Sequence, residues 1–134
     1  MRAIPELETE RLILRGWRQS DFDAHAEMMA ATEVARFLTW NGRPEDRAAA
    51  WRAMALYLGH WALRGHGLFV IARKSDGAFL GRAGLWQPEG AVGCEIGWGL
   101  HPAYWGAGYA IEAARRAAVW AFDDLGLDHL ISLV

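Results

Sequence analysis

The alternation of apolar and polar residues in the first half of the chain predicts one strand and two helices. Residues 11–17 alternate as a strand does. Ser20 is expected to cap the first helix, and residues 36–42 are expected to form a loop after it. Pro44 is placed to open the second helix, where its missing N–H costs little, and Gly65 is placed to end it.

The second half begins with apolar runs separated by short polar turns, a pattern typical of an antiparallel meander rather than of β-α-β units. These runs are 68–73, 79–87 and 92–100. A helical pattern follows over 108–124, in which Glu112 and Arg116 are expected to pair on the outer face. Another apolar strand is expected over 129–134. The predicted order is β-α-α-β-β-β-α-β, an α+β sheet with helices packed on it.

The segment from His101 to Ala110 joins the last strand of the meander to the long helix and contains Gly106 and Gly108. Glycines one residue apart let the backbone turn sharply and expose successive N–H groups, and the positive end of a helix dipole lies beside them. That geometry suits a pyrophosphate; the alternative is a tight turn that binds nothing. A dinucleotide fingerprint is excluded because Ile111 stands where the third glycine is needed, and the chain lacks the Gly-Lys-Ser/Thr of a P-loop.

Composition and charge narrow the function further. The 134 residues are 53% hydrophobic and 22% charged, as in an ordinary globular domain. A net charge of −2 provides no basic surface for nucleic acid, and no apolar stretch reaches membrane-spanning length. Residues 1–6 lack the apolar segment of a signal peptide, and the one cysteine, Cys94, suits a reducing compartment. We therefore expect a cytoplasmic protein without nucleic acid or membrane partners.

Other reactive side chains show no spacing that indicates a metal site or a hydrolase. The five histidines lack metal-ligand spacing, and no serine lies in a Gly-x-Ser-x-Gly elbow. Cys94 has no base partner in view and is expected to be a buried structural thiol.

Separate segments of the chain, in the same order, resemble the GNAT N-acetyltransferases and within them the RimJ/RimL branch. The matching segments are 7–15 with Asp21-Phe22, 74–77 with 80–85, 93–102 and 105–113, the last two resembling the acetyl-CoA motif. Trp105 departs from the Gln or Arg of the general pattern, but the branch often carries Trp there. The resemblance implies a single GNAT domain over 1–134, with a mixed, mostly antiparallel sheet and helices on both faces.

The same resemblance implies transfer of an acetyl group from acetyl-CoA, as cosubstrate and without a metal, to a primary amine by direct attack. The residues that it implies for cofactor binding are Trp98, Gly99, Leu100, Trp105, Gly106, Ala107, Gly108, Tyr109 and Ala110. The strand would pair with the amides of pantetheine like an added strand, with Gly97 and Gly99 allowing the close approach. Alternatively these two glycines relieve crowding against Trp86 or Trp98.

Glu95 is the carboxylate beside the implied cofactor strand, and several GNAT enzymes use a glutamate there as the base that takes the amine proton. Its alternatives are to bind a cationic amine or to lie solvated at the edge. A backbone N–H between Trp98 and Leu100 is expected to polarise the thioester carbonyl. The family's usual acid is a tyrosine on a helix beyond this sequence, so no acid is assigned; Tyr104 is the first residue in view to test.

An acceptor pocket is expected between the first two helices, with the aromatic and apolar walls Phe37, Leu38, Trp40 and Trp86. Acceptors in this branch include protein N-terminal amines and small-molecule amines, and these residues do not choose between them. Few acidic groups occur in the loop region, so a polyamine is not favoured. A non-catalytic CoA-binding or interaction module on the same fold is the alternative function.

The apolar run 129–134 has no polar close, whereas resembling proteins continue with a further helix and two strands. We therefore expect the domain to be incomplete at its C-terminus. Either the natural chain is longer or a second copy covers the exposed edge strand in a homodimer. The 134-residue chain alone is expected to be a poor catalyst.

Overall fold

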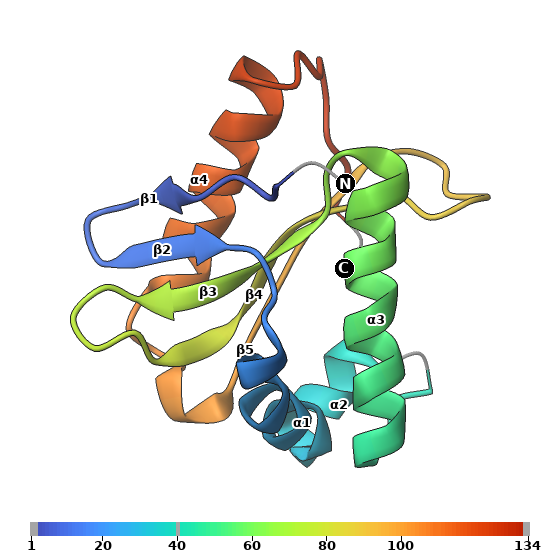
Figure 1. Cartoon of the computed structure of the whole chain (residues 1–134), viewed down its shortest axis with the longest axis vertical. Coiled ribbons are helices and arrows are strands. Elements are labelled where there is room, and N and C mark those ends of the chain that lie inside the picture. The colour runs from blue at the N-terminus through green and yellow to red at the C-terminus, as the bar shows by residue number, and fades with distance from the viewer. Residues whose placement is uncertain (1–2, 40, 133–134) are drawn as a thin grey trace.

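The computed structural model describes residues 3–39 and 41–132, and within these ranges the chain forms a five-stranded antiparallel sheet with helices on both faces (Figure 1). The elements are β1 (Leu7–Glu8), β2 (Leu12–Arg15), a 3-10 turn (Gln19–Asp21), α1 (Phe22–Ala30), α2 (Thr32–Leu38), α3 (Arg47–Arg64), β3 (Leu68–Arg73), β4 (Phe79–Trp86), β5 (Glu95–Leu100), a second 3-10 turn (Pro102–Tyr104) and α4 (Tyr109–Asp123). The strands lie in the order β1-β2-β3-β4-β5, each antiparallel to its neighbour. This confirms the predicted α+β class and meander.

Alternate residues of β3 pack against helices on opposite faces of the sheet. Phe69 and Ile71 belong to the core shared with α4, where the ring centroids of Phe69 and Trp120 are 5.4 Å apart. Leu68 and Val70 belong to the core on the α3 side. Because both faces of β3 are buried, the strand is a continuous apolar run rather than an alternating one.

Two helix starts differ from the prediction. The first helix begins at Phe22, after the 3-10 turn, and the buried carboxylate of Asp21 rather than Ser20 accepts hydrogen bonds there, from Arg15 and the N–H of Arg18. The helix expected to open at Pro44 begins at Arg47, because Asp46 is the residue whose carboxylate accepts the N–H of Ala49 at 2.8 Å.

The end of α3 lies where the sequence predicted it. Gly65 lies just past α3 with a φ of 76°, a left-handed conformation that glycine adopts without a steric penalty.

The segment expected to be a loop over 36–42 begins as the end of a helix. Ala31 has extended backbone angles (φ −73°, ψ 128°), which end α1 and allow the chain to restart as α2. Neither glycine nor proline marks this break, so the spacing of apolar residues along the sequence did not reveal it. As a result, Phe37 and Leu38 lie on a helix that packs against β5.

The strand expected over 129–134 is reduced, among the described residues, to one parallel bridge between Ile131 and Glu95. The N–H of Ile96 donates to the Ile131 carbonyl at 2.8 Å, and the N–H of Ile131 donates to the Cys94 carbonyl at 3.0 Å. Residues 133 and 134 lie outside the described part. In the described part, the bridge therefore occupies only the beginning of the outer edge of β5. No helix found in residues 3–39 and 41–132 has both the length and the apolarity needed to cross a membrane.

Candidate functional site

The turn between β5 and α4 presents a row of backbone N–H groups. Gly106 and Gly108 have φ values of 85° and 82°, in the left-handed region, and Gly108 caps α4 without a side-chain hydrogen bond. The N–H groups from Gly106 to Ile111 donate to no acceptor among the described residues. They lie at the positive end of the α4 dipole, so the turn can bind an anion such as a pyrophosphate. The space above it is open, since a Cβ at Gly106 would meet no atom within 4 Å.

Arg11 places a cation beside this turn, a feature that sequence reasoning missed. Its Nη2 is 3.6 Å from where a Cβ of Gly108 would lie, and its guanidinium carbon lies 4.3 Å from the ring centroid of Tyr109. Its Nε donates to Glu112 at 2.8 Å. The expected pair of Glu112 with Arg116 is therefore wrong, because Arg116 donates instead to the carbonyl of Glu8 at 3.2 Å.

The outer edge of β5 continues the open surface. Outward and inward N–H groups alternate along a strand, and that of Ile96 points outward to Ile131, so those of Trp98 and Leu100 point outward as well. The Leu100 carbonyl accepts the indole N–H of Trp105 at 2.9 Å. In the described part of the chain nothing pairs with the backbone of Trp98. An extended chain of amides can therefore add to this edge.

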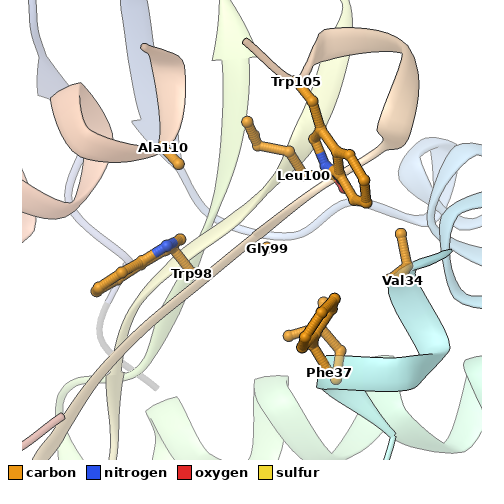
Figure 2. Close-up of a pocket in the computed structure, with 8 residues that line it drawn as sticks. Val34, Phe37, Trp98, Gly99, Leu100, Trp105 and Ala110 are labelled. Atoms are coloured by element: carbon orange, nitrogen blue, oxygen red, sulfur yellow. Dashed lines mark hydrogen bonds between the residues drawn. The ribbon is translucent and has the colours of Figure 1, made fainter. Parts of the chain in front are cut away.

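A cavity of about 250 Å³ opens where β5, the turn and α2 meet (Figure 2). It is lined by Val34, Phe37, Leu38, Trp98, Gly99, Leu100, Trp105 and Ala110. Phe37 is 74% exposed, Trp98 44% and Trp105 49%, an unusual amount of open aromatic surface in one place. Gly99 has a packing reason as well, because a Cβ there would collide with Leu38 rather than with the expected Trp86 or Trp98.

The nine residues implied for cofactor binding form one continuous stretch of surface. Five of them, Trp98, Gly99, Leu100, Trp105 and Ala110, line the 250 Å³ cavity. The others, Gly106, Ala107, Gly108 and Tyr109, form the adjoining turn and the first residue of α4.

A second cavity, of about 790 Å³, adjoins the first and shares Phe37, Leu38 and Trp98 with it. Its walls come from α1, α2, α3, β3, β4 and β5 and include Leu56, Tyr57, Leu68, Trp86 and Gly97. Of the predicted acceptor pocket, Phe37, Leu38 and Trp86 line this cavity, whereas Trp40 lies outside the described residues. We call the 790 Å³ space the acceptor cavity.

Glu95 lies in the acceptor cavity and is half-buried at the start of β5, opposite Trp86. The nearest atom to a Cβ built on Gly97 is Oε1 of Glu95, at 4.0 Å, so the strand beyond the carboxylate is open to a close approach. The carboxylate is therefore placed at the acceptor cavity beside β5, where it can contact a bound ligand.

Arg82 and Glu45 are cavity residues that sequence reasoning missed. Nη1 of Arg82 donates to the hydroxyl of Tyr57. Burial lowers the pKa of Arg82 to about 10, while the charges of Glu45 and Glu95 oppose this shift. Oε1 of Glu45 is buried without a partner among the described residues. The available signal was Arg82 itself, a lone charge within the apolar run of β4.

Two other candidates lie outside these cavities. Cys94 is buried, and burial raises the pKa of its thiol, which keeps it protonated. Tyr104 lines neither cavity; its ring centroid lies 5.3 Å from the guanidinium carbon of Arg73 and 6.0 Å from the His101 ring. Within residues 3–39 and 41–132, no three His, Cys, Asp or Glu side chains gather as metal ligands would.

Residues 11–134 match the model of a family described as an acetyltransferase (GNAT) domain. Two curated relatives are Uncharacterized N-acetyltransferase p20 of Bacillus licheniformis, 29% identical over 92% of this chain and 70% of the relative, and Uncharacterized N-acetyltransferase YnaD of Bacillus subtilis, 26% identical over 94% and 71%. A crystal structure of an acetyltransferase from Agrobacterium tumefaciens str. C58 superposes with a TM-score of 0.84 at 35% identity, covering 100% of this chain and 76% of that one.

Proposed function

This chain belongs to the GNAT acetyltransferase family and is an acyl-CoA-dependent N-acetyltransferase; on that premise we propose that it transfers an acetyl group from acetyl-CoA to a primary amine by direct attack. The acceptor is the amine of a protein N-terminus or of a small molecule. The Trp105 variant of the glycine motif supports an assignment to the RimJ/RimL-like branch. We further propose that residues 1–134 belong to one such domain and that it acts in the cytoplasm, as its single cysteine suggests.

The observation that carries the proposal is the row of N–H groups from Gly106 to Ile111, which find no acceptor among the described residues. These groups would hold the pyrophosphate of acetyl-CoA, with Arg11 adding a cation beside them. Pantetheine would then follow the edge of β5 past Leu100 and Trp98, where no strand among the described residues pairs with it. This path ends beside the acceptor cavity, because Trp98 lines both cavities.

In the proposed reaction, acetyl-CoA supplies an activated acetyl group at the junction of the two cavities. The neutral amine nitrogen attacks the thioester carbonyl carbon, the new C–N bond forms, and the C–S bond breaks with its electron pair leaving on sulfur. Glu95 accepts the proton that the amine must lose, directly or through a water. A backbone N–H of β5 stabilises the charge that develops on the carbonyl oxygen. We assign no residue as the acid that protonates the leaving thiolate.

The test is release of the CoA thiol from acetyl-CoA with a panel of small amines and N-terminal peptides, using the wild type, Glu95→Gln and Glu33→Gln. Glu33 is an exposed carboxylate on α2 that lines neither cavity and serves as the matched control. Loss of the base is expected to reduce kcat about 100-fold or more, whereas loss of a substrate contact alone would raise KM. Glu33→Gln should match the wild type. Unchanged kcat and KM in Glu95→Gln would remove Glu95 from the mechanism, and absence of thiol release with every amine would contradict the proposed function.

A further inference from the structure

Arg82 contributes a cation to the acceptor cavity, and among the described residues most of the hydrogen-bonding capacity of its guanidinium is unused. One guanidinium nitrogen, Nη1, donates to the hydroxyl of Tyr57, and in the described part of the chain no other group accepts from the remaining N–H donors. The side chain is partly buried in the cavity wall. A guanidinium in such surroundings gains most from an anionic partner that can accept two hydrogen bonds at once.

The cavity also contains negative charge. Glu45 and Glu95 line it and lie near enough to act on the charge of Arg82, although neither forms a hydrogen bond or a close ion pair with it. Oε1 of Glu45 is buried and unpartnered among the residues that the structure describes. Among the described residues, the cavity thus offers a cation without an ion pair and two carboxylates that act on its charge, which matches a ligand that carries both signs of charge.

A ligand with only positive charges fits this arrangement less well. A diamine or polyamine would gain from Glu45 and Glu95 but would place a second cation close to Arg82, and like charges at short range in a partly buried site are unfavourable. The carboxylates alone therefore do not indicate a polyamine acceptor.

We propose that the acceptor is an amino acid-type molecule, which carries its carboxylate close to the amine that is acetylated, and that Arg82 binds this carboxylate. Glu95 and Glu45 face the amine. The proposal rests on the proposed function, because it concerns the acceptor of that same reaction. The aromatic rings of Phe37, Tyr57 and Trp86 in the cavity wall suit an apolar or aromatic side chain on the acceptor.

The experiment compares three acceptors that share a ring and an amine: phenylalanine, phenylalaninamide and 2-phenylethylamine. The dication 1,5-diaminopentane represents the polyamine alternative. Values of kcat/KM with acetyl-CoA are corrected for the fraction of neutral amine at the assay pH, since the amines differ in pKa. We expect phenylalanine to exceed both neutral-tail analogues at least about tenfold, as a charge-assisted bidentate contact would produce.

Arg82→Met removes the charge but keeps a side chain of similar length, and Arg115→Met on the exposed face of α4 is the matched control. We expect Arg82→Met to bring the ratio of phenylalanine to 2-phenylethylamine close to one, Arg82→Lys to restore part of it, and Arg115→Met to leave it at the wild-type value. Calorimetry provides a comparison that needs no turnover. It measures the ratio of the affinities for N-acetylphenylalanine and N-acetyl-2-phenylethylamine in the presence of CoA, and we expect the variants to change this ratio in the same direction.

Wild-type protein that acetylates 2-phenylethylamine or 1,5-diaminopentane as well as phenylalanine would overturn the proposal, while leaving the acetyltransferase function intact. Equal losses for all acceptors in Arg82→Met would also overturn it, because they indicate a structural role for Arg82. If no amine is acetylated, the proposed function fails, and the calorimetric comparison of the two products still decides whether Arg82 selects a carboxylate. If Arg82→Met does not fold, the wild-type ratios alone are decisive.

Discussion

At the glycine turn, the groups available to a ligand are backbone N–H groups rather than side chains. Gly106 and Gly108 hold left-handed φ angles that turn their N–H groups, and those that follow, away from protein acceptors in the described part of the chain. A side chain at either position would be strained regardless of the space around it. Under the proposed function, anion binding at this turn therefore depends on the conformation of two residues and not on any charged group within it.

Gly108→Val is expected to weaken CoA binding at least about tenfold, because a β-branched residue destabilises the left-handed conformation and its side chain intrudes on the N–H row. Gly126→Val is the control: Gly126 has a φ of 73°, has no atom within 4 Å of its Cβ position, and lies beyond the opposite end of α4. It imposes a similar strain away from the site. Calorimetry with CoA measures both variants, and circular dichroism checks that each is folded. Wild-type affinity in a folded Gly108→Val variant would show that the turn does not hold the anion.

Residues of the candidate site differ in how well the sequence around them predicts that they belong to it. The glycine turn is a local feature of the sequence, so its spacing, together with the segments around it that resemble the acetyl-CoA motif, was enough to predict an anion site there. Arg82, Glu45 and Tyr57 come from β4, the segment before α3, and α3 itself, and only tertiary packing brings them to one cavity. No spacing rule connects these three residues with each other or with Glu95, which is why the sequence analysis missed them although it predicted Glu95 itself.

At the scale of elements, the position of α4 is fixed through its first turn. Glu112 accepts hydrogen bonds from the Thr9 hydroxyl, from the N–H of Arg11 at 3.0 Å and from Nε of Arg11 at 2.8 Å. These bonds connect the N-terminus of α4 to the β1–β2 turn. The N–H row of the glycine turn is therefore held against the sheet by the same carboxylate.

Glu112→Gln is expected to lower the free energy of unfolding at pH 7 by about 1–3 kcal/mol, the usual cost of losing hydrogen bonds to a charged group. Burial would raise the pKa of Glu112, but the bonds from Thr9 and Arg11 outweigh it and lower the pKa below its ordinary 4.5. A lowered folded-state pKa gives stability that is present above 4.5 and lost as the pH falls through the folded-state value. The difference between wild type and Glu112→Gln should therefore shrink below pH 4.5.

Urea denaturation at pH 7 and at acid pH measures this difference. Glu89→Gln is the control, because Glu89 is fully exposed and its contact with Arg64 is a loose 3.6 Å; it should change the unfolding free energy by less than about 0.5 kcal/mol. A Glu112→Gln variant as stable as Glu89→Gln at pH 7 would contradict the role of Glu112 in holding α4.

Elements marked by strong local signals were predicted closely, and those without such signals were not. The run 68–73 is β3 as predicted, because a strand buried on both faces is apolar throughout. The break at Ala31 between α1 and α2 has no glycine or proline, so no local signal in the sequence marks it. The strand expected over 129–134 depends on pairing that the described residues make only at Ile131.

For the whole molecule, both faces of the sheet carry part of the buried core, and the acceptor cavity lies on one of them. On one face α4 covers a core that includes Trp61, Phe69 and Trp120. The other face supports α1, α2 and α3 (Figure 1). The acceptor cavity is lined by residues of these helices and of β3, β4 and β5. Among the described residues, no strand pairs with the outer edge of β5 beyond the Ile131 bridge, and Trp98 on this strand lines both cavities. A chain bound along this edge would therefore reach the acceptor cavity beside Trp98.

The path of CoA over this surface is the central claim, and amide NMR of the isotope-labelled protein on titration with CoA tests it most directly. We expect the largest shift changes at the amides from Gly106 to Ile111, with further changes at Trp98 and Leu100, because these N–H groups gain hydrogen bonds on binding. Amides of α3 outside the cavities should move little. Binding that leaves the Gly106–Ile111 amides in place and shifts another surface instead would contradict the claim.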